Sequence, residues 1–194
     1  MNLPNLLTVL RVLLTFVASL LLCCDVRFFA IAAFIIYCTA GATDWFDGYI
    51  ARKCNIVTTF GKFMDALSDK IMVVTMFMTL FALDLYGNWS MLALWLAIIS
   101  MTREFYVSGI RMLASNKGIV MAAETVGKYK AGFQMYSIGA IIFAHALRLD
   151  FASGDSILFM LGFYSGIITL IISTLLSIWS GASYGARYSY LLRE

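Results

Sequence analysis

Residues 28–50 decide the fold class of this chain, and they read FFAIAAFIIYCTAGATDWFDGYI. No charged residue occurs between Phe28 and Thr43, and the first charges of the segment, Asp44 and Asp47, fall near its end. A helix that crosses a membrane needs about 20 predominantly apolar residues, which this segment supplies. Other stretches of the chain share this character. The sequence therefore predicts an all-α protein that is embedded in a membrane.

The composition of the whole chain agrees with this fold class. Of its 194 residues, 62% are hydrophobic and only 13% are charged, whereas about a quarter of the residues in a soluble domain are charged. A domain of this size cannot bury so much apolar surface in one water-soluble core. This excludes an ordinary soluble enzyme, a secreted disulfide scaffold and a disordered tail. The formal net charge is only +3, so no basic field points to nucleic acid as a partner.

We expect one membrane-embedded domain over residues 1–194, with six transmembrane helices. The predicted spans are residues 6–24, 28–50, 61–83, 89–109, 131–148 and 156–180. An alternative for the N-terminus is a short amphipathic helix over residues 1–10 that lies on the membrane surface, followed by a shorter first span. The sequence has no internal repeat strong enough to indicate an inverted-repeat transporter.

The lysines and arginines between the spans predict the orientation. With six spans, both termini lie on one side of the membrane. The segments on that side carry Arg52, Lys53, Lys62, Arg111, Lys117, Lys128, Lys130, Arg187 and Arg193. The segments on the other side carry only Arg27 and Arg148. Because positive residues are enriched on the cytoplasmic side, we expect both termini and the charged loops in the cytoplasm.

Four aspartates gather at the cytoplasmic ends of the second and third spans. Asp44 and Asp47 are three residues apart, and Asp65 and Asp69 are four apart, so each pair shares a helix face. An aspartate near the centre of a membrane helix costs roughly 2.5–3.5 kcal/mol. Two facing pairs of carboxylates need cations as compensation, and hard divalent ions such as Mg²⁺ or Mn²⁺ prefer oxygen ligands.

Small residues accompany the aspartates on the same helix faces. Gly48, Ala51 and Gly61 remove side-chain bulk, which lets a phosphate or a nucleotide approach the helix backbone. Arg52, four residues after Gly48, is a candidate phosphate partner. The alternative is that these small residues only allow close helix packing.

Two other classes of function remain as alternatives. A cation channel or transporter would need acidic residues distributed along a pore, whereas these four lie at one end. A non-catalytic membrane scaffold gives no reason for four paired carboxylates.

The segment from Asp44 to Asp69 matches the pattern D-x2-D-G-x2-A-R-x8-G-x3-D-x3-D at every fixed position. In this it resembles the CDP-alcohol phosphotransferases, integral membrane enzymes of phospholipid synthesis. The N-terminal residues Pro4 to Thr8 with Arg11 also look like this family. Further similarities point to the branch that transfers a phosphatidyl group from CDP-diacylglycerol to glycerol 3-phosphate. They are Arg103-Glu104-Phe105, Ser108-Gly109-Ile110-Arg111, Gly127-Lys128 and Gln134-Met135.

The resemblance implies roles for the motif residues. Asp44, Asp47, Asp65 and Asp69 would bind two divalent cations that hold the CDP diphosphate, and Asp69 would also be the catalytic base. Asp44, Gly48, Ala51, Arg52, Gly61 and Asp65 would line the CDP site. The family fold implies six membrane helices in a homodimer, and a bacterial inner membrane as the location.

Cations at and after the fourth span bear on the identity of the acceptor. Glycerol 3-phosphate is a dianion, so we expect Arg103, Arg111 and Lys128 to bind its phosphate. Arg103 and Arg111 are eight residues apart and can share a helix face. Alternatives within the family are inositol phosphate, serine, or phosphatidylglycerol as in a cardiolipin synthase. For Arg111, Lys117, Lys128 and Lys130, the other interpretation is that they only set the topology.

Overall fold

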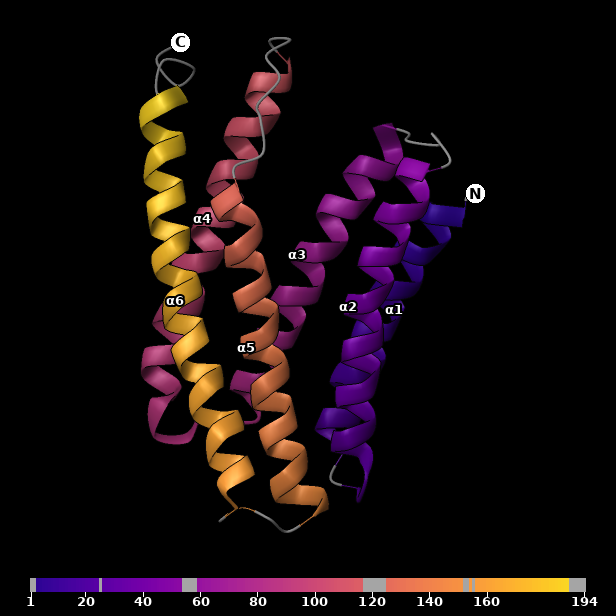
Figure 1. Cartoon of the computed structure of the whole chain (residues 1–194), viewed down its shortest axis with the longest axis vertical. Coiled ribbons are helices and arrows are strands. Elements are labelled where there is room, and N and C mark those ends of the chain that lie inside the picture. Colours follow the sequence, from indigo (N-terminus) through magenta and orange to yellow (C-terminus); the bar gives the residue numbers. More distant parts are fainter. Residues whose placement is uncertain are drawn as a thin grey trace. The chain divides into compact units, whose positions relative to one another are not determined.

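Helices account for all the regular structure in the described part of the chain. The computed structural model describes residues 3–24, 26–53, 59–116, 125–151, 154 and 156–188. The helices are α1 (Leu3–Cys23), α2 (Phe29–Lys53), α3 (Thr59–Ala82), the short 3-10 helix η1 (Gly87–Trp89), α4 (Ser90–Asn116), α5 (Thr125–Asp150) and α6 (Ile157–Tyr188) (Figure 1). Each predicted span corresponds to one α-helix, so the predicted all-α class is confirmed.

Several helices extend beyond the apolar stretches that predict them. The fourth runs to Asn116, the fifth begins at Thr125 and the sixth runs to Tyr188. Hydropathy locates the part of a helix that lies in lipid, whereas the backbone hydrogen bonds continue where the side chains become polar. At the N-terminus, α1 is one continuous helix, and Pro4 falls in its first turn, where a missing N–H costs little.

Length and apolar character single out three of the described helices as able to cross a membrane. They are α1 from Leu6, the stretch Gly87–Ser115 that contains α4, and α6. In α2 the apolar part, Phe29–Thr43, is shorter because the aspartates follow it. The remaining helices, α3 and α5, carry more charged residues.

The chain divides into two compact units. The first contains residues 1–86 and 138–164, and the second contains residues 87–137 and 165–194. The helices α5 and α6 therefore each contribute one part to each unit. The single membrane-embedded domain over residues 1–194 stays a prediction.

In the first unit, α1 packs against both α2 and α3. It forms a hairpin with α2 (Figure 1). Two polar contacts fix its register on α3: Arg11 contacts Asp69, and Ser19 Oγ lies 2.6 Å from Thr79 Oγ1. The contact that lies further along α1 also lies further along α3, so the two helices run in the same direction.

The start of α2 is held by the last residue of α5. Asp150 is buried, and its carboxylate accepts hydrogen bonds from the N–H groups of Phe28 and Ile31, both at 2.7 Å. The Phe28 N–H directly precedes the helix and the Ile31 N–H lies in its first turn, where N–H groups lack partners within the helix. Phe28 has a φ of 69°, a conformation that is strained for a bulky residue. The Asp150 contacts therefore fix both the strained turn and the helix start.

Small residues allow α5 to approach its neighbours in the first unit. A Cβ on Gly139 would lie 3.2 Å from Tyr37 of α2, and one on Gly162 of α6 would lie 3.6 Å from the Ala140 carbonyl oxygen. Alanines of other helices, such as Ala18 and Ala33, are fully buried. Helices in lipid associate through such close packing, because an apolar side chain gains no hydrophobic free energy when it moves from lipid into contact with another helix.

The end of α3 is a Schellman motif. The N–H of Leu85 donates to the Leu80 carbonyl at 3.0 Å, and the N–H of Asp84 donates to the Phe81 carbonyl at 3.1 Å. Asp84 occupies the left-handed position with a φ of 48°, which aspartate tolerates better than most residues.

In the second unit, α4 and α6 run in the same direction with polar contacts between them. Ser100 Oγ lies 3.2 Å from Thr174 Oγ1, and further along both helices Arg103 donates to Ser180. The N-terminal part of α5 joins α6 through Ser137, whose hydroxyl donates to the Gly166 carbonyl at 2.6 Å.

Replacing Asp150 tests this account of the α2 start. Asp150→Ala leaves two N–H groups at the start of α2 without their acceptor, so the free energy of unfolding should fall by about 1–3 kcal/mol. Asp150→Asn keeps one acceptor oxygen and should lose less. Leu149→Ala, at an exposed position beside it, is the control, and unfolding in detergent is the measurement. Equal stability of Asp150→Ala and Leu149→Ala would contradict this role.

Candidate active site

Both halves of the acidic motif are helical. Asp44, Asp47, Gly48, Ala51 and Arg52 all fall in the last turns of α2. Gly61, Asp65 and Asp69 fall in the first half of α3. The three- and four-residue spacings therefore place each aspartate pair on one helix face. Because α2 and α3 both pack against α1, the two motif helices share a neighbour.

Most side chains of the motif lie outside the described residues. This applies to Asp44, Asp47, Gly48, Ala51, Arg52 and Asp65. The structure describes Gly61, which is half-buried, and Asp69. The convergence of the four carboxylates stays a prediction.

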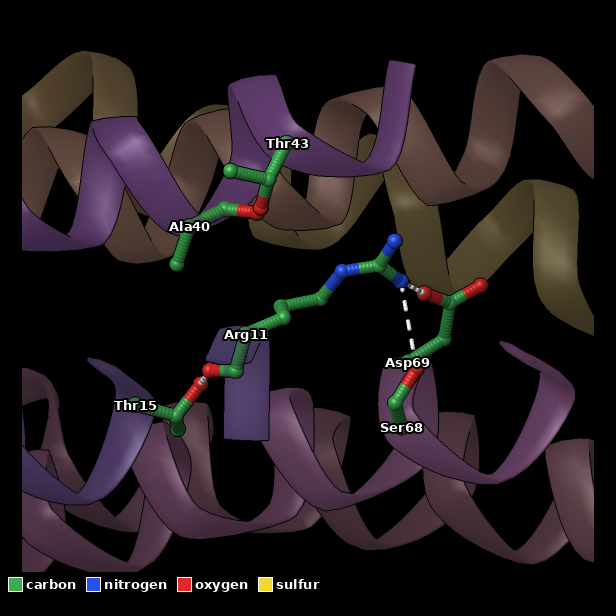
Figure 2. A network of polar contacts seen from close by, with 6 residues as sticks. All are labelled: Arg11, Thr15, Ala40, Thr43, Ser68 and Asp69. Carbon is green, nitrogen blue, oxygen red and sulfur yellow. Dashed lines mark hydrogen bonds and ion pairs between the residues drawn. The ribbon is translucent and has the colours of Figure 1, made fainter. Parts of the chain in front are cut away.

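Asp69 forms an ion pair with Arg11 of α1. Arg11 Nη1 donates to Asp69 Oδ1 at 2.7 Å and to Ser68 Oγ at 3.2 Å. Figure 2 shows the Arg11 side chain extending toward these two residues of α3. Arg11 is fully buried, whereas the Asp69 side chain is 56% exposed. The pair therefore anchors a buried cation on a carboxylate that is still accessible from outside.

The sequence contains a signal for this contact that our interpretation did not use. Arg11 is the only charged residue among the first 24, and we assigned it only to a segment that resembles the family. A charged residue within an apolar span is costly and normally has a specific partner. The partner, Asp69, lies 58 residues away and follows only from the packing of α1 on α3.

The residue types of the motif suit a divalent cation. The four aspartates offer only hard carboxylate oxygens, the ligand type that Mg²⁺ and Mn²⁺ prefer. Asp69 has the exposure that a ligand needs. Thr43, directly before the first aspartate, turns its hydroxyl to the Ala40 carbonyl at 2.7 Å, as Figure 2 shows.

A second group of charged side chains lies in the second unit. The Arg103 side chain is 11% exposed, and its Nη2 donates to Ser180 Oγ of α6 at 2.5 Å. Glu104 Oε1 lies 3.9 Å from Arg103 Nη1 and pairs with Lys130 of α5. The group thus joins α4, α5 and α6.

The three predicted acceptor residues differ in their surroundings. Arg103 is largely enclosed, whereas Arg111 and Lys128 are exposed. No described contact joins the three, so their common pocket stays a prediction. The Glu104–Lys130 pair was not predicted, although Glu104 within an apolar span required a partner.

Comparisons with known proteins agree with the motif. The model of the CDP-alcohol phosphatidyltransferase family matches residues 1–179 of this chain. The chain is 38% identical over 123 residues to the CDP-diacylglycerol–glycerol-3-phosphate 3-phosphatidyltransferase of Bacillus subtilis, a match that covers 63% of this chain and 60% of that protein. It is 29% identical over 188 residues to the protein of the same name from Escherichia coli K12, covering 94% of this chain and 92% of that protein. The resemblance indicated by the motif is thereby confirmed.

Arg11 is open to a direct test. Because the Asp69 side chain is 56% exposed, its carboxylate stays solvated when Arg11 is removed, so Arg11→Ala leaves no uncompensated buried charge. It removes the hydrogen bonds of Arg11 to Asp69 and Ser68, and a hydrogen bond to a charged group contributes about 1.5–3 kcal/mol. We expect a corresponding loss in the free energy of unfolding in detergent, and a smaller loss for Arg11→Lys, which keeps the charge. The control is Arg148→Ala at an exposed position. If Arg11→Ala and Arg148→Ala were equally stable, the pair would have no structural role.

Proposed function

Because the chain belongs to the CDP-alcohol phosphatidyltransferase family, we propose that it transfers the phosphatidyl group of CDP-diacylglycerol to the 1-hydroxyl of glycerol 3-phosphate. The products are phosphatidylglycerophosphate and CMP. One observation carries this proposal: a complete acidic motif stands on two consecutive helices of a chain that the family model matches over residues 1–179. The names of the bacterial relatives supply the donor and the acceptor.

The motif residues bind the CDP-diacylglycerol headgroup. Asp44, Asp47, Asp65 and Asp69 would hold two divalent cations, Mg²⁺ or Mn²⁺, because carboxylate oxygens are the ligands that these ions prefer. When bound, the cations would neutralise the charge of the diphosphate and the charge that develops on the CMP leaving group. The CDP site is lined by Asp44, Gly48, Ala51, Arg52, Gly61 and Asp65.

Asp69 is the base of the transfer. It accepts the proton of the attacking hydroxyl while the new P–O bond forms and the bond to CMP breaks, without a covalent enzyme intermediate. Arg11 holds this carboxylate through Oδ1, which fixes its position on the motif face. Positioning and electrostatics supply most of the rate in phosphoryl transfer, so a fixed base fits the chemistry.

The acceptor phosphate binds to Arg103, Arg111 and Lys128. A phosphate dianion needs several positive groups, whereas serine as acceptor does not. The ordered guanidinium of Arg103 supports this assignment, because an arginine held inside a helix group presents its donors in a fixed geometry. Inositol phosphate, serine and phosphatidylglycerol are the acceptors against which the proposal is tested.

The protein acts in a membrane. Its apolar helices and its bacterial relatives make it an integral membrane protein. We place it in the bacterial inner membrane, with both termini and the active site facing the cytoplasm, because the predicted spans assign nine lysines and arginines to that side and two to the other. A homodimer in contact with membrane lipid is the proposed assembly, and no nucleic acid is involved.

The acceptor preference is the most direct test. Purified protein in detergent–lipid micelles with CDP-diacylglycerol and Mg²⁺ should release CMP when glycerol 3-phosphate is added. Serine, inositol phosphate and phosphatidylglycerol should each give less than about a hundredth of that rate, since the polar groups of a site fit only their own ligand. CMP release that depends on one of these three instead would refute the proposed acceptor.

Metal removal tests the donor site separately. A chelator should abolish CMP release, because four carboxylates repel the diphosphate when no cation lies between them. Addition of Mg²⁺ or Mn²⁺ should restore the activity, and Ca²⁺, which prefers more ligands at longer distances, should restore less. Asp69→Asn should remain inactive with added metal. Full activity in the chelator would contradict a metal-assisted transfer.

A further inference from the structure

We propose that Ser180 and Gly181 of α6 are positioning residues that hold Arg103 for the acceptor phosphate. This inference rests on the proposed function, because it assigns Arg103 to glycerol 3-phosphate. It adds that the C-terminal part of α6 sets the affinity of the site for its acceptor.

The contact between Arg103 and α6 has two parts. Ser180 is fully buried, and its Oγ accepts a hydrogen bond of 2.5 Å from Arg103 Nη2. At the next residue, a Cβ on Gly181 would lie 2.8 Å from Arg103 Cγ, 3.5 Å from Nε and 3.7 Å from Cδ. The aliphatic part of the Arg103 side chain therefore lies along the backbone of Gly181, and the Ser180 hydroxyl fixes the guanidinium.

Only glycine fits at position 181 with this arrangement. Real Cβ atoms do not approach other atoms to 2.8 Å, and Cγ lies close to the α4 backbone, so it cannot move aside like the end of a flexible side chain. An alanine at this position would displace the arginine stem or separate the two helices. The glycine is thus matched to one particular arginine conformation.

The neighbouring Glu104 and Lys130 favour the same conformation of Arg103. Glu104 Oε1 lies 3.9 Å from Arg103 Nη1, and Glu104 also pairs with the buried Lys130. Because Lys130 already compensates Glu104, the carboxylate does not cancel the charge of Arg103 completely. The group of three retains one net positive charge beside Ser180.

Holding an arginine in place affects binding more than chemistry. An arginine side chain loses considerable rotational freedom when it binds a phosphate, and a fixed guanidinium has already lost it. Ser180 and Gly181 therefore act on the affinity for the dianionic acceptor.

The two residues also lie beyond the part of the chain that the family model matches, which ends at residue 179.

The test compares glycine and serine substitutions in the steady-state kinetics of CMP release. Gly181→Ala and Ser180→Ala should raise the KM for glycerol 3-phosphate about tenfold, as expected when one hydrogen bond to a charged group is lost or misaligned. The KM for CDP-diacylglycerol and the kcat should change less than about twofold.

Two glycines serve as matched controls. Gly132→Ala adds a methyl group with nothing within 4 Å. Gly185→Ala, on α6 like Gly181, meets only the end of the Tyr106 side chain, with the hydroxyl at 3.3 Å and Cε1 at 3.8 Å. Both should leave the KM for glycerol 3-phosphate unchanged. If Gly181→Ala does not fold, Ser180→Ala carries the test, since it removes atoms only.

A double substitution distinguishes positioning from a general loss of packing. In an Arg103→Lys background the Nη2 donor is absent, so adding Ser180→Ala should raise the KM no further. Additive effects, an unchanged KM in Ser180→Ala, or equal increases for both substrates would overturn the inference alone. If the wild-type protein did not use glycerol 3-phosphate at all, the proposed function would fail, and this inference would fail with it.

Discussion

The ion pair between Arg11 and Asp69 connects the apolar first helix to the acidic motif. A guanidinium that is fully buried requires an anionic partner, because desolvation of an isolated charge is very costly. The partner here belongs to the motif itself, and the pair sets the register of α1 on α3 together with the Ser19–Thr79 contact. The same contact therefore packs α1 against α3 and holds the Asp69 carboxylate of the motif in place.

Polar contacts specify the packing elsewhere in the described chain. Asp150 holds the start of α2, Ser137 joins α5 to α6, and Ser180 joins α6 to α4. In lipid, apolar side chains gain little by leaving their solvent, so hydrogen bonds and small residues determine which helix faces meet. Each helix therefore carries a few polar positions whose partners lie far away in the sequence.

The sequence predicted the helices well and their partners poorly. Apolar stretches of sufficient length gave all six helices, but not the extensions of α4 to Asn116 and α6 to Tyr188, where hydropathy ends before the helix does. The motif gave the family, since its residues stand at fixed local spacings. Arg11 with Asp69, and Glu104 with Lys130, remained hidden because each pairing depends on how separate helices pack. A lone charge in an apolar stretch reveals that a partner exists, and only the fold identifies it.

The contact of Asp150 with the first turn of α2 has a consequence for biogenesis. The chain is synthesised from its N-terminus, so α1 and α2 enter the membrane before residue 150 has been made. Until then, the N–H groups of Phe28 and Ile31 depend on water for their hydrogen bonds. The first hairpin is therefore completed only when the fifth helix arrives, and assembly of the first unit ends late in translation.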